Sequence, residues 1–258
     1  MINNRLTSLF DKPEKIFSIF VTAGFPNLES TVKIVETLAQ NGVDLIELGI
    51  PFSDSIADGS TIQKANELAL SKGASLVYTL ETLREIRNRG VEIPIILMGS
   101  LNPILQFGVE KFCAEAEKSG ADGLILPDLP LEFYVHNYLK TFESNNLANI
   151  FLVTSQTSES RLRQIDEISN SFIYVVSLAG VTGKSLEIDD ERRSYLQRLQ
   201  QLNLRSPLMV GFGIENKTHF DELSKYASGA IIGSAFLREI ENAADVNIAS
   251  IDFVKKFL

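Results

Sequence analysis

The chain has 258 residues, of which 33 are acidic and 24 are basic, so its formal charge is −9. An acidic chain without a basic stretch is a poor binder of nucleic acid and of anionic membranes. Hydrophobic residues make up 45% of the sequence, an ordinary share for a globular protein with a sizeable core. We therefore expect a soluble protein that binds neither nucleic acid nor membrane.

Cysteine use and the amino terminus point to a reducing compartment. Cys113 is the one cysteine, so an internal disulfide is impossible. The opening stretch MINNRLTSLFDKPEK lacks the apolar core of a signal peptide, and no apolar run is long enough to span a membrane. We expect a cytoplasmic protein, and we interpret Cys113 as a small apolar helix residue rather than a nucleophile.

A local pattern recurs along the chain, in which a polar helix end is followed by a glycine and a short apolar run. Gly42, Gly120 and Gly229 occupy the glycine position and are predicted to end helices in the left-handed conformation. The apolar runs are short and continuous, which is typical of parallel strands buried on both faces.

Eight such runs follow one another through the chain. They cover residues 16–24, 43–50, 93–99, 121–128, 148–154, 171–177, 206–213 and 228–234. Amphipathic spacing between them predicts helices, for example over 27–41, 158–169 and 189–202. Eight alternations of strand and helix predict an α/β fold, a (β/α)8 TIM barrel forming a single domain over 1–258, with a doubly wound sheet as the alternative.

Catalytic groups of such a barrel are expected at the carboxyl ends of its strands. Glu47 interrupts the apolar run of LIELGIPFSDSIADGST, residues 45–61. A buried carboxyl group without a partner either has a raised pKa or destabilises the fold, and such groups concentrate at catalytic sites. A functional Glu47 is therefore favoured over a structural one.

Three aspartates near predicted strand ends are more ambiguous. Asp58 begins an Asp-Gly pair, which indicates a turn, although it could also place a second carboxyl group over the pocket of Glu47. Asp54 could equally cap or brace its loop. Asp128 lies between two prolines, and rigid loop geometry explains it at least as well as chemistry does.

Small residues gather at the ends of the last three strands. Gly183, Gly213, Gly233 and Ser234 could offer backbone N–H groups to one phosphate, because the loops after the last barrel strands commonly bind phosphate. A turn explains each glycine taken alone. His136 and His219 are expected at the surface or at helix caps, and neither zinc-ligand spacing nor a dinucleotide-binding glycine motif is present.

Several motifs together resemble one known family along nearly the whole chain. The sequence resembles the tryptophan synthase alpha subunit in the stretches FVTAGFP, LIELGIPFSDSIADGSTIQ, NPILQFG, GLILPDLP, AGVTG, VGFGI and IIGSA. The resemblance implies a lyase that cleaves indole-3-glycerol phosphate to indole and glyceraldehyde 3-phosphate by a retro-aldol reaction. It implies no metal and no cofactor in this subunit, and a pyridoxal-phosphate beta subunit as partner in an αββα complex.

The resemblance also implies roles for individual residues. It assigns general acid–base catalysis to Glu47, contact with the indole N–H to Asp58, and closure over the Asp58 loop to Thr182. It implies phosphate contacts from Gly183, Gly213, Gly233 and Ser234. The implied walls of the indole and glycerol pocket are Phe20, Tyr174 and Phe212.

The chain departs from the family pattern at five positions. Ser55 and Ser60 stand where the family usually has Pro, Ser100 and Leu101 replace the usual aromatic residues before Asn-Pro, and Leu178 replaces an Arg. Two fewer prolines predict a more flexible loop and weaker coupling to the beta subunit. The alternatives are a lyase that acts alone and releases free indole, a docking subunit with little turnover, and, remotely, another phosphate-binding barrel of the same pathway.

Overall fold

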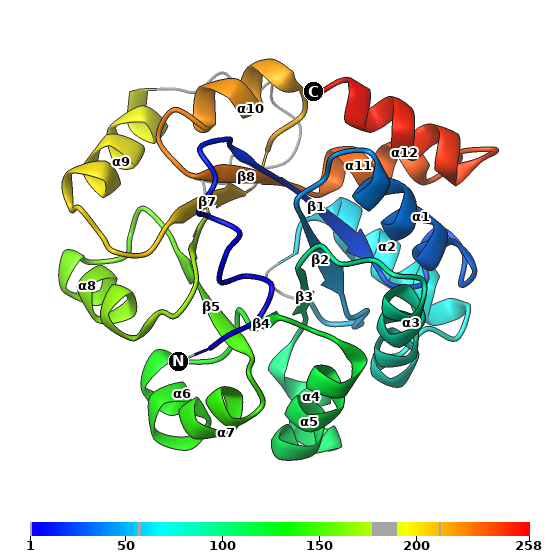
Figure 1. Ribbon diagram of the computed structural model, residues 1–258, viewed down its shortest axis with the longest axis horizontal. Coiled ribbons are helices and arrows are strands. Elements are labelled where there is room, and N and C mark those ends of the chain that lie inside the picture. Colours follow the sequence, from blue (N-terminus) through cyan, green and yellow to red (C-terminus); the bar gives the residue numbers. More distant parts are fainter. Residues whose placement is uncertain (1, 56–57, 177–189, 212) are drawn as a thin grey trace.

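Eight parallel strands close into a barrel surrounded by a ring of helices (Figure 1). This computed structural model describes residues 2–55, 58–176, 190–211 and 213–258. Neighbouring strands pair in chain order, and the last strand pairs with the first through Ile16 and Gly229. The predicted (β/α)8 barrel is confirmed, and the doubly wound alternative is wrong because such a sheet would leave two open edges.

Each predicted apolar run contains one strand, and each strand is shorter than its run. The strands are β1 (Ile16–Thr22), β2 (Leu45–Gly49), β3 (Ile95–Met98), β4 (Gly123–Ile125), β5 (Ala148–Val153), β6 (Ile173–Val176), β7 (Leu208–Gly211) and β8 (Gly229–Ile232). The surplus apolar residues lie in the turns at the strand ends. All seven residues of β1 are buried, as expected of a strand between the barrel interior and the helix layer.

Twelve helices occupy the described part of the chain. They are α1 (Ser30–Gln40), α2 (Ser60–Ser71), α3 (Leu76–Asn88), α4 (Leu101–Phe107), α5 (Val109–Ser119), α6 (Leu131–Asn137), α7 (Leu139–Ser144), α8 (Glu159–Ile168), α9 (Asp190–Gln201), α10 (Lys217–Leu223), α11 (Ser234–Ile240) and α12 (Val246–Lys255). The three helices predicted from amphipathic spacing correspond to α1, α8 and α9. Within this part of the chain, two helices follow each of β2, β3, β4 and β8, and one helix follows each of the other strands.

Two of the three predicted helix-ending glycines are confirmed. Gly42 and Gly120 have φ of 98° and 92°, the left-handed region that favours glycine. The prediction for Gly229 is wrong, because this residue opens β8. A Cβ at Gly229 would overlap the carbonyl oxygen of Ile16 and lie 2.6 Å from the Ile16 Cβ, so glycine here allows β8 to approach β1.

The isolated cysteine and histidines match their structural interpretations. Cys113 lies on α5 and is completely buried, and burial raises the pKa of its thiol to about 12, which makes it unreactive near neutral pH. His136 is exposed on α6. His219 lies near the start of α10, where its Nδ1 accepts a hydrogen bond from the Glu215 N–H at 3.4 Å.

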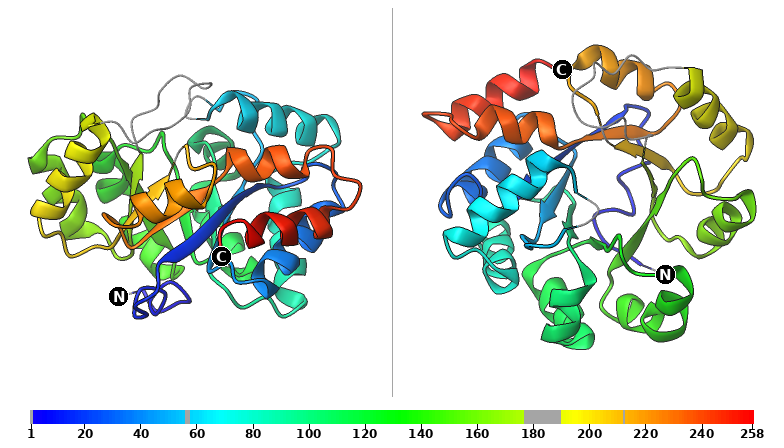
Figure 2. Two further views of the ribbon diagram at one scale, coloured as in Figure 1. Left: turned by 90° about the horizontal axis from the view of Figure 1, so that it is seen from above. Right: turned by 180° about the vertical axis from the view of Figure 1, so that it is seen from behind.

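The amino-terminal segment crosses one end of the barrel, as the dark blue trace shows (Figures 1 and 2). The Asn4 amide donates to the Asp122 carbonyl at 2.6 Å, and Leu6 is buried in the core. The carboxylate of Asp122 accepts from the Arg87 guanidinium and from the Ile95 N–H, both at 2.8 Å. Because these groups lie at the amino ends of the strands, they form the floor of the barrel, and the opposite end is left for the site.

None of the helices in the described ranges has both the length and the apolar character that crossing a membrane requires.

Candidate active site

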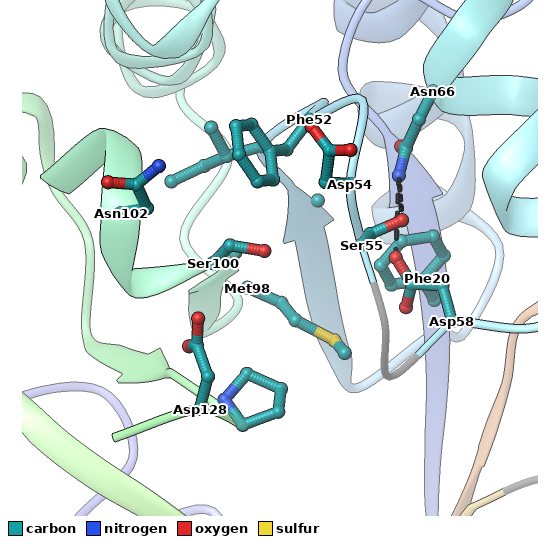
Figure 3. A pocket seen from close by; sticks show the side chains of 14 residues that line it. Phe20, Phe52, Asp54, Ser55, Asp58, Asn66, Met98, Ser100, Asn102 and Asp128 are labelled. Atoms are coloured by element: carbon teal, nitrogen blue, oxygen red, sulfur yellow. Dashed lines mark hydrogen bonds between the residues drawn. The ribbon is translucent and has the colours of Figure 1, made fainter.

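A cavity of about 500 Å³ opens at the carboxyl ends of β1, β2 and β3 (Figure 3). Phe20, Met98 and Pro127 supply apolar wall, whereas Asp58 and Asn66 supply polar groups. This volume falls within the usual range of small-molecule sites, and a mostly apolar lining with a few polar groups is typical of them. The site therefore lies where the strand-end argument predicts it.

Glu47 lies in the middle of β2, next to Phe20 on β1 and Ile96 on β3. Its side chain is sealed from solvent, with 1% exposure, and it lies beside the cavity rather than in its lining. Within the described residues, its Oε1 atom has no hydrogen-bond partner. Burial, and secondly the charge of Asp58, raise the pKa of Glu47 to about 8, so this carboxyl group holds its proton at neutral pH.

Asp58 lies in the loop between β2 and α2 and lines the cavity directly. Its N–H donates to the Ser55 carbonyl at 3.2 Å, and its Oδ2 accepts from the Asn66 amide at 3.3 Å. Burial raises the pKa of Asp58, whereas the Ser55 and Asn66 side chains lower it. Asp58 therefore places its carboxyl group at the cavity, where its charge acts on Glu47.

Asn66 is a site residue that the sequence argument missed. It lies on α2 and shares a buried face with Ile62, Ala65 and Ala69. A polar residue at an apolar position of a helical pattern is a usable signal, because a buried amide needs partners. Reading the spacing of residues 60–71 in this way would have identified Asn66.

Two glycines leave room for the side chains of Phe20 and Tyr174, which are predicted to form walls of the pocket. A Cβ at Gly49 would lie 2.5 Å from the ring of Phe20, and one at Gly211 would overlap the hydroxyl end of Tyr174. Tyr174 is buried, and burial followed by the charges of Glu47 and Asp58 raises its pKa well above the usual value. Tyr174 therefore lies close to both carboxyl groups.

The predicted phosphate-binding residues occupy the ends of the last two strands. Gly213 follows β7 with φ of 78°, Gly233 follows β8, and Ser234 begins α11. A Cβ at Gly233 would be 3.4 Å from the Cβ of Phe20, so this turn adjoins the cavity wall.

Four residues of the sequence prediction lie outside the described residues. They are Leu178, Thr182, Gly183 and Phe212.

The two other aspartates of the sequence argument both line the cavity. Asp54 accepts a hydrogen bond from the Ser53 hydroxyl at 2.6 Å. Both carboxylate oxygens of Asp128 accept from the Leu101 N–H, at 2.9 and 3.0 Å. Asp128 thus holds the first N–H group of α4 from the neighbouring loop.

Phe52 and Pro127 also line the cavity beside these carboxyl groups, and neither was predicted from the sequence. The described residues contain no group of three or more His, Cys, Asp or Glu side chains that could hold a metal ion.

The barrel and this pocket define a (β/α)8-barrel enzyme whose site holds a buried, protonated carboxyl group beside a second one at the cavity surface. A model of the tryptophan synthase alpha chain family matches residues 6–257. The chain belongs to the tryptophan synthase alpha chain family, the lyase that cleaves indole-3-glycerol phosphate in tryptophan biosynthesis.

Curated relatives cover almost the whole chain. The sequence is 48% identical to the tryptophan synthase alpha chain of Christiangramia forsetii over 253 residues, which is 98% of each chain. It is also 48% identical to the alpha chain of Flavobacterium psychrophilum over 237 residues, 92% of this chain and 93% of the relative.

Solved structures agree with the fold. A tryptophan synthase alpha chain from Legionella pneumophila superposes with a TM-score of 0.89 at 34% identity, covering 99% of this chain and 96% of that one. A chain of the tryptophan synthase complex from Pyrococcus furiosus gives a TM-score of 0.85 at 33% identity, with coverages of 94% and 97%. In this family the alpha chain uses no cofactor, and pyridoxal phosphate belongs to the beta subunit.

Proposed function

We propose that Glu47 and Asp58 carry out the retro-aldol cleavage of indole-3-glycerol phosphate, and that the chain works as the alpha subunit of an αββα complex. The observation that carries the proposal is the pairing of a sealed carboxyl group, whose pKa is about 8, with a second carboxyl group that lines the cavity. Such a pair supplies one proton donor and one charge-stabilising group at neutral pH.

Glu47 moves the protons in this scheme. Its carboxyl group gives a proton to C3 of the indole ring, which makes that carbon tetrahedral and leaves a positive charge at N1. The resulting carboxylate then takes the proton of the hydroxyl group on the carbon bonded to C3. The carbon–carbon bond breaks, its electron pair returns to the ring to form indole, and the freed carbon becomes the aldehyde of glyceraldehyde 3-phosphate. Glu47 ends the cycle protonated, as it began.

Asp58 stabilises the charge that develops between these two steps. Its carboxylate accepts a hydrogen bond from the indole N–H, and this bond strengthens as N1 becomes positive. The hydrogen bond from Asn66 favours the ionised form that this role requires. The two carboxyl groups thus have different roles because their surroundings differ.

Further residues hold the substrate in this scheme. Phe20, Tyr174 and Phe212 form the walls for the indole and glycerol parts, and Thr182 closes over the Asp58 loop. Backbone N–H groups of small residues bind the phosphate, an arrangement that needs no Lys or Arg. These residues are Gly183, Gly213, Gly233 and Ser234.

A beta subunit is the proposed partner on the face that carries the cavity. Leu105 on α4 and Phe133 on α6 are 47% and 46% exposed, and both helices follow strands whose carboxyl ends surround the site. We assign the contact with the beta subunit to these two side chains. The Pyrococcus furiosus relative comes from a tryptophan synthase complex, which supports the same assignment.

We further propose that residues 1–258 act as one domain in the cytoplasm. The barrel uses strands from Ile16 to Ile232, and the last helix, α12, packs against the first helix, α1, so the first and last helices belong to one layer. The single buried cysteine fits a reducing compartment.

The catalytic assignment is tested by indole release from indole-3-glycerol phosphate. Glu47→Gln removes the proton donor at nearly constant size, and we expect a loss of about a thousandfold in kcat. Asp58→Asn should cost about a hundredfold. The control is Glu67→Gln, an exposed site on α2, which should retain the wild-type rate. Substantial turnover by Glu47→Gln would overturn the role given to Glu47.

The partner assignment is tested by repeating the assay with a beta subunit present. A slow rate that rises sharply on adding the partner supports the alpha-subunit proposal. A fast rate that ignores the partner favours a lyase that acts alone. Absence of turnover in both conditions, with complex formation intact, favours a docking subunit.

A further inference from the structure

The loop between β2 and α2 contains a buried hydroxyl group that the scheme above does not use. Ser55 is 8% exposed and lines the cavity together with Asp58. It is also one of the positions at which the chain departs from its family, where Pro is usual. Proline has no side-chain donor, so this hydroxyl group adds a chemical function to the loop.

Asn66 connects Ser55 with Asp58. Its side-chain amide donates to the Ser55 Oγ at 3.2 Å and to the Asp58 Oδ2 at 3.3 Å (Figure 3). A primary amide carries two N–H groups, so it serves both acceptors at once. Because the Ser55 oxygen accepts from Asn66, the proton of the hydroxyl group is left for donation to another acceptor.

We infer that Ser55 is a positioning residue for Asp58, donating its hydroxyl proton to the Asp58 carboxylate while it accepts from Asn66. One backbone N–H group and one side-chain amide hold the Ser55 carbonyl, and so fix the backbone that carries the hydroxyl group. The Asp58 N–H donates to the Ser55 carbonyl at 3.2 Å, and the Gln63 amide donates to the same carbonyl at 3.3 Å. The inference rests on the role proposed above for Asp58, and it holds for the chain without its partner.

The charges around Asp58 make such donors necessary. Glu47 on β2 and Tyr174 on β6 both interact with the charge of Asp58, and Asp54 and Asp128 line the same cavity. No Lys or Arg is among the described residues that line it. Burial raises the pKa of Asp58, and the Ser55 and Asn66 side chains oppose this. Hydrogen bonds from Ser55 and Asn66 therefore stabilise the Asp58 carboxylate in place of a cation.

The experiment compares Ser55→Ala with Ser55→Thr in the purified chain, without a beta subunit. For Ser55→Ala we expect kcat/KM for indole-3-glycerol phosphate to fall about tenfold near neutral pH. The acid limb of its pH profile should move to higher pH by about 0.5 to 1 unit. Ser55→Thr keeps a hydroxyl group and should retain most of the activity. Ser60→Ala, an exposed site at the start of α2, is the matched control and should change neither quantity.

A second measurement separates this inference from the proposed function. The Asp58 carboxyl carbon is titrated by carbon-13 NMR, with its signal assigned by its loss in Asp58→Asn. The titration midpoint should rise in Ser55→Ala and not in Ser60→Ala. An unchanged midpoint in Ser55→Ala overturns the inference, even if Asp58→Asn is inactive. Wild-type turnover by Asp58→Asn would instead overturn the catalytic role of Asp58, while the midpoint would still decide whether Ser55 donates to it.

Discussion

Tyr174 fills the space in front of Gly211, where any other residue would place its first side-chain carbon. The two residues come from the adjacent strands β6 and β7, and Tyr174 lies close to both carboxyl groups of the site. Gly211→Ala should therefore displace the Tyr174 ring, reduce kcat by tenfold or more, and lower the free energy of unfolding by about 1–3 kcal/mol. Steady-state kinetics and urea unfolding measure the two effects.

A double-mutant cycle checks that this effect passes through the tyrosine. Tyr174→Ala removes the ring, so Gly211→Ala should destabilise the chain much less in that background than in the wild type. Equal costs in both backgrounds would mean that Gly211 is needed for another reason.

Glu47 should limit the activity at high pH. The proposed first step needs the protonated carboxyl group, and the pKa of Glu47 is about 8 because of burial and, secondly, the charge of Asp58. We expect kcat/KM to decrease as the pH rises through about 8, with a slope of one proton. Initial rates between pH 6 and pH 10 test this. A flat profile to pH 10 would show that the ionised form starts the reaction.

The same carboxyl group should make stability depend on pH. The folded-state pKa of Glu47 lies above its ordinary value of 4.5, so the folded chain holds this proton more tightly than the unfolded chain. The contribution of Glu47 to the free energy of unfolding therefore decreases between about pH 4.5 and pH 8. Glu47→Gln has no such proton. Relative to wild type, it should gain about 3 kcal/mol between pH 6 and pH 9, as measured by urea unfolding.

The barrel floor predicts a stability effect without a catalytic one. Asp122 is buried and accepts hydrogen bonds from Arg87 and Ile95, so Asp122→Asn should lower the free energy of unfolding by about 2–4 kcal/mol. The kcat of the folded variant should stay within about twofold of wild type, because the site lies at the other end. Asp252→Asn, which removes an exposed ion pair with Lys255, is the control and should have little effect.

The docking surface proposed for the partner predicts a loss of activation. Leu105→Asp or Phe133→Asp should leave the rate of the isolated chain unchanged, because neither residue lines the cavity. Stimulation by a beta subunit should fall at least tenfold, since each change buries a charge in the interface. Ile248→Asp, at an exposed apolar site on α12, should retain full stimulation. Equal loss in all three variants would place the contact elsewhere.

The fold could be predicted from the sequence because strands that are buried on both faces consist of continuous runs of apolar residues. Eight continuous apolar runs separated by helical spacing indicate a barrel, and all eight contain a strand. Element bounds were predicted less well, since apolar residues continue past the strands into turns. Gly229 was misread because a glycine before an apolar run also occurs where two strands approach closely.

The site could be predicted in part for a similar reason. Glu47 is conspicuous because burying a carboxyl group inside an apolar run has a desolvation cost, which suggests a functional reason for its presence. Asn66, Met98 and Phe52 reach the cavity from α2, β3 and a loop, and this meeting depends on how the elements pack. The role of Asp128 could not be predicted, because its partner is the backbone N–H of Leu101. Every residue except proline has such a group, so the sequence does not indicate which one a side chain will bind.

The contacts of the amino-terminal segment constrain the order in which the molecule can fold. The Asn3 N–H bonds to the Asn146 side chain, and the Asn4 amide bonds to the carbonyl groups of Asp122 and Asn146. These partners lie more than a hundred residues further along the chain, so they are synthesised later. Asn3 and Asn4 must therefore wait for the segments before β4 and β5 to be synthesised before they can dock. This segment therefore reaches its final place only after Asn146, a residue just before β5, is available.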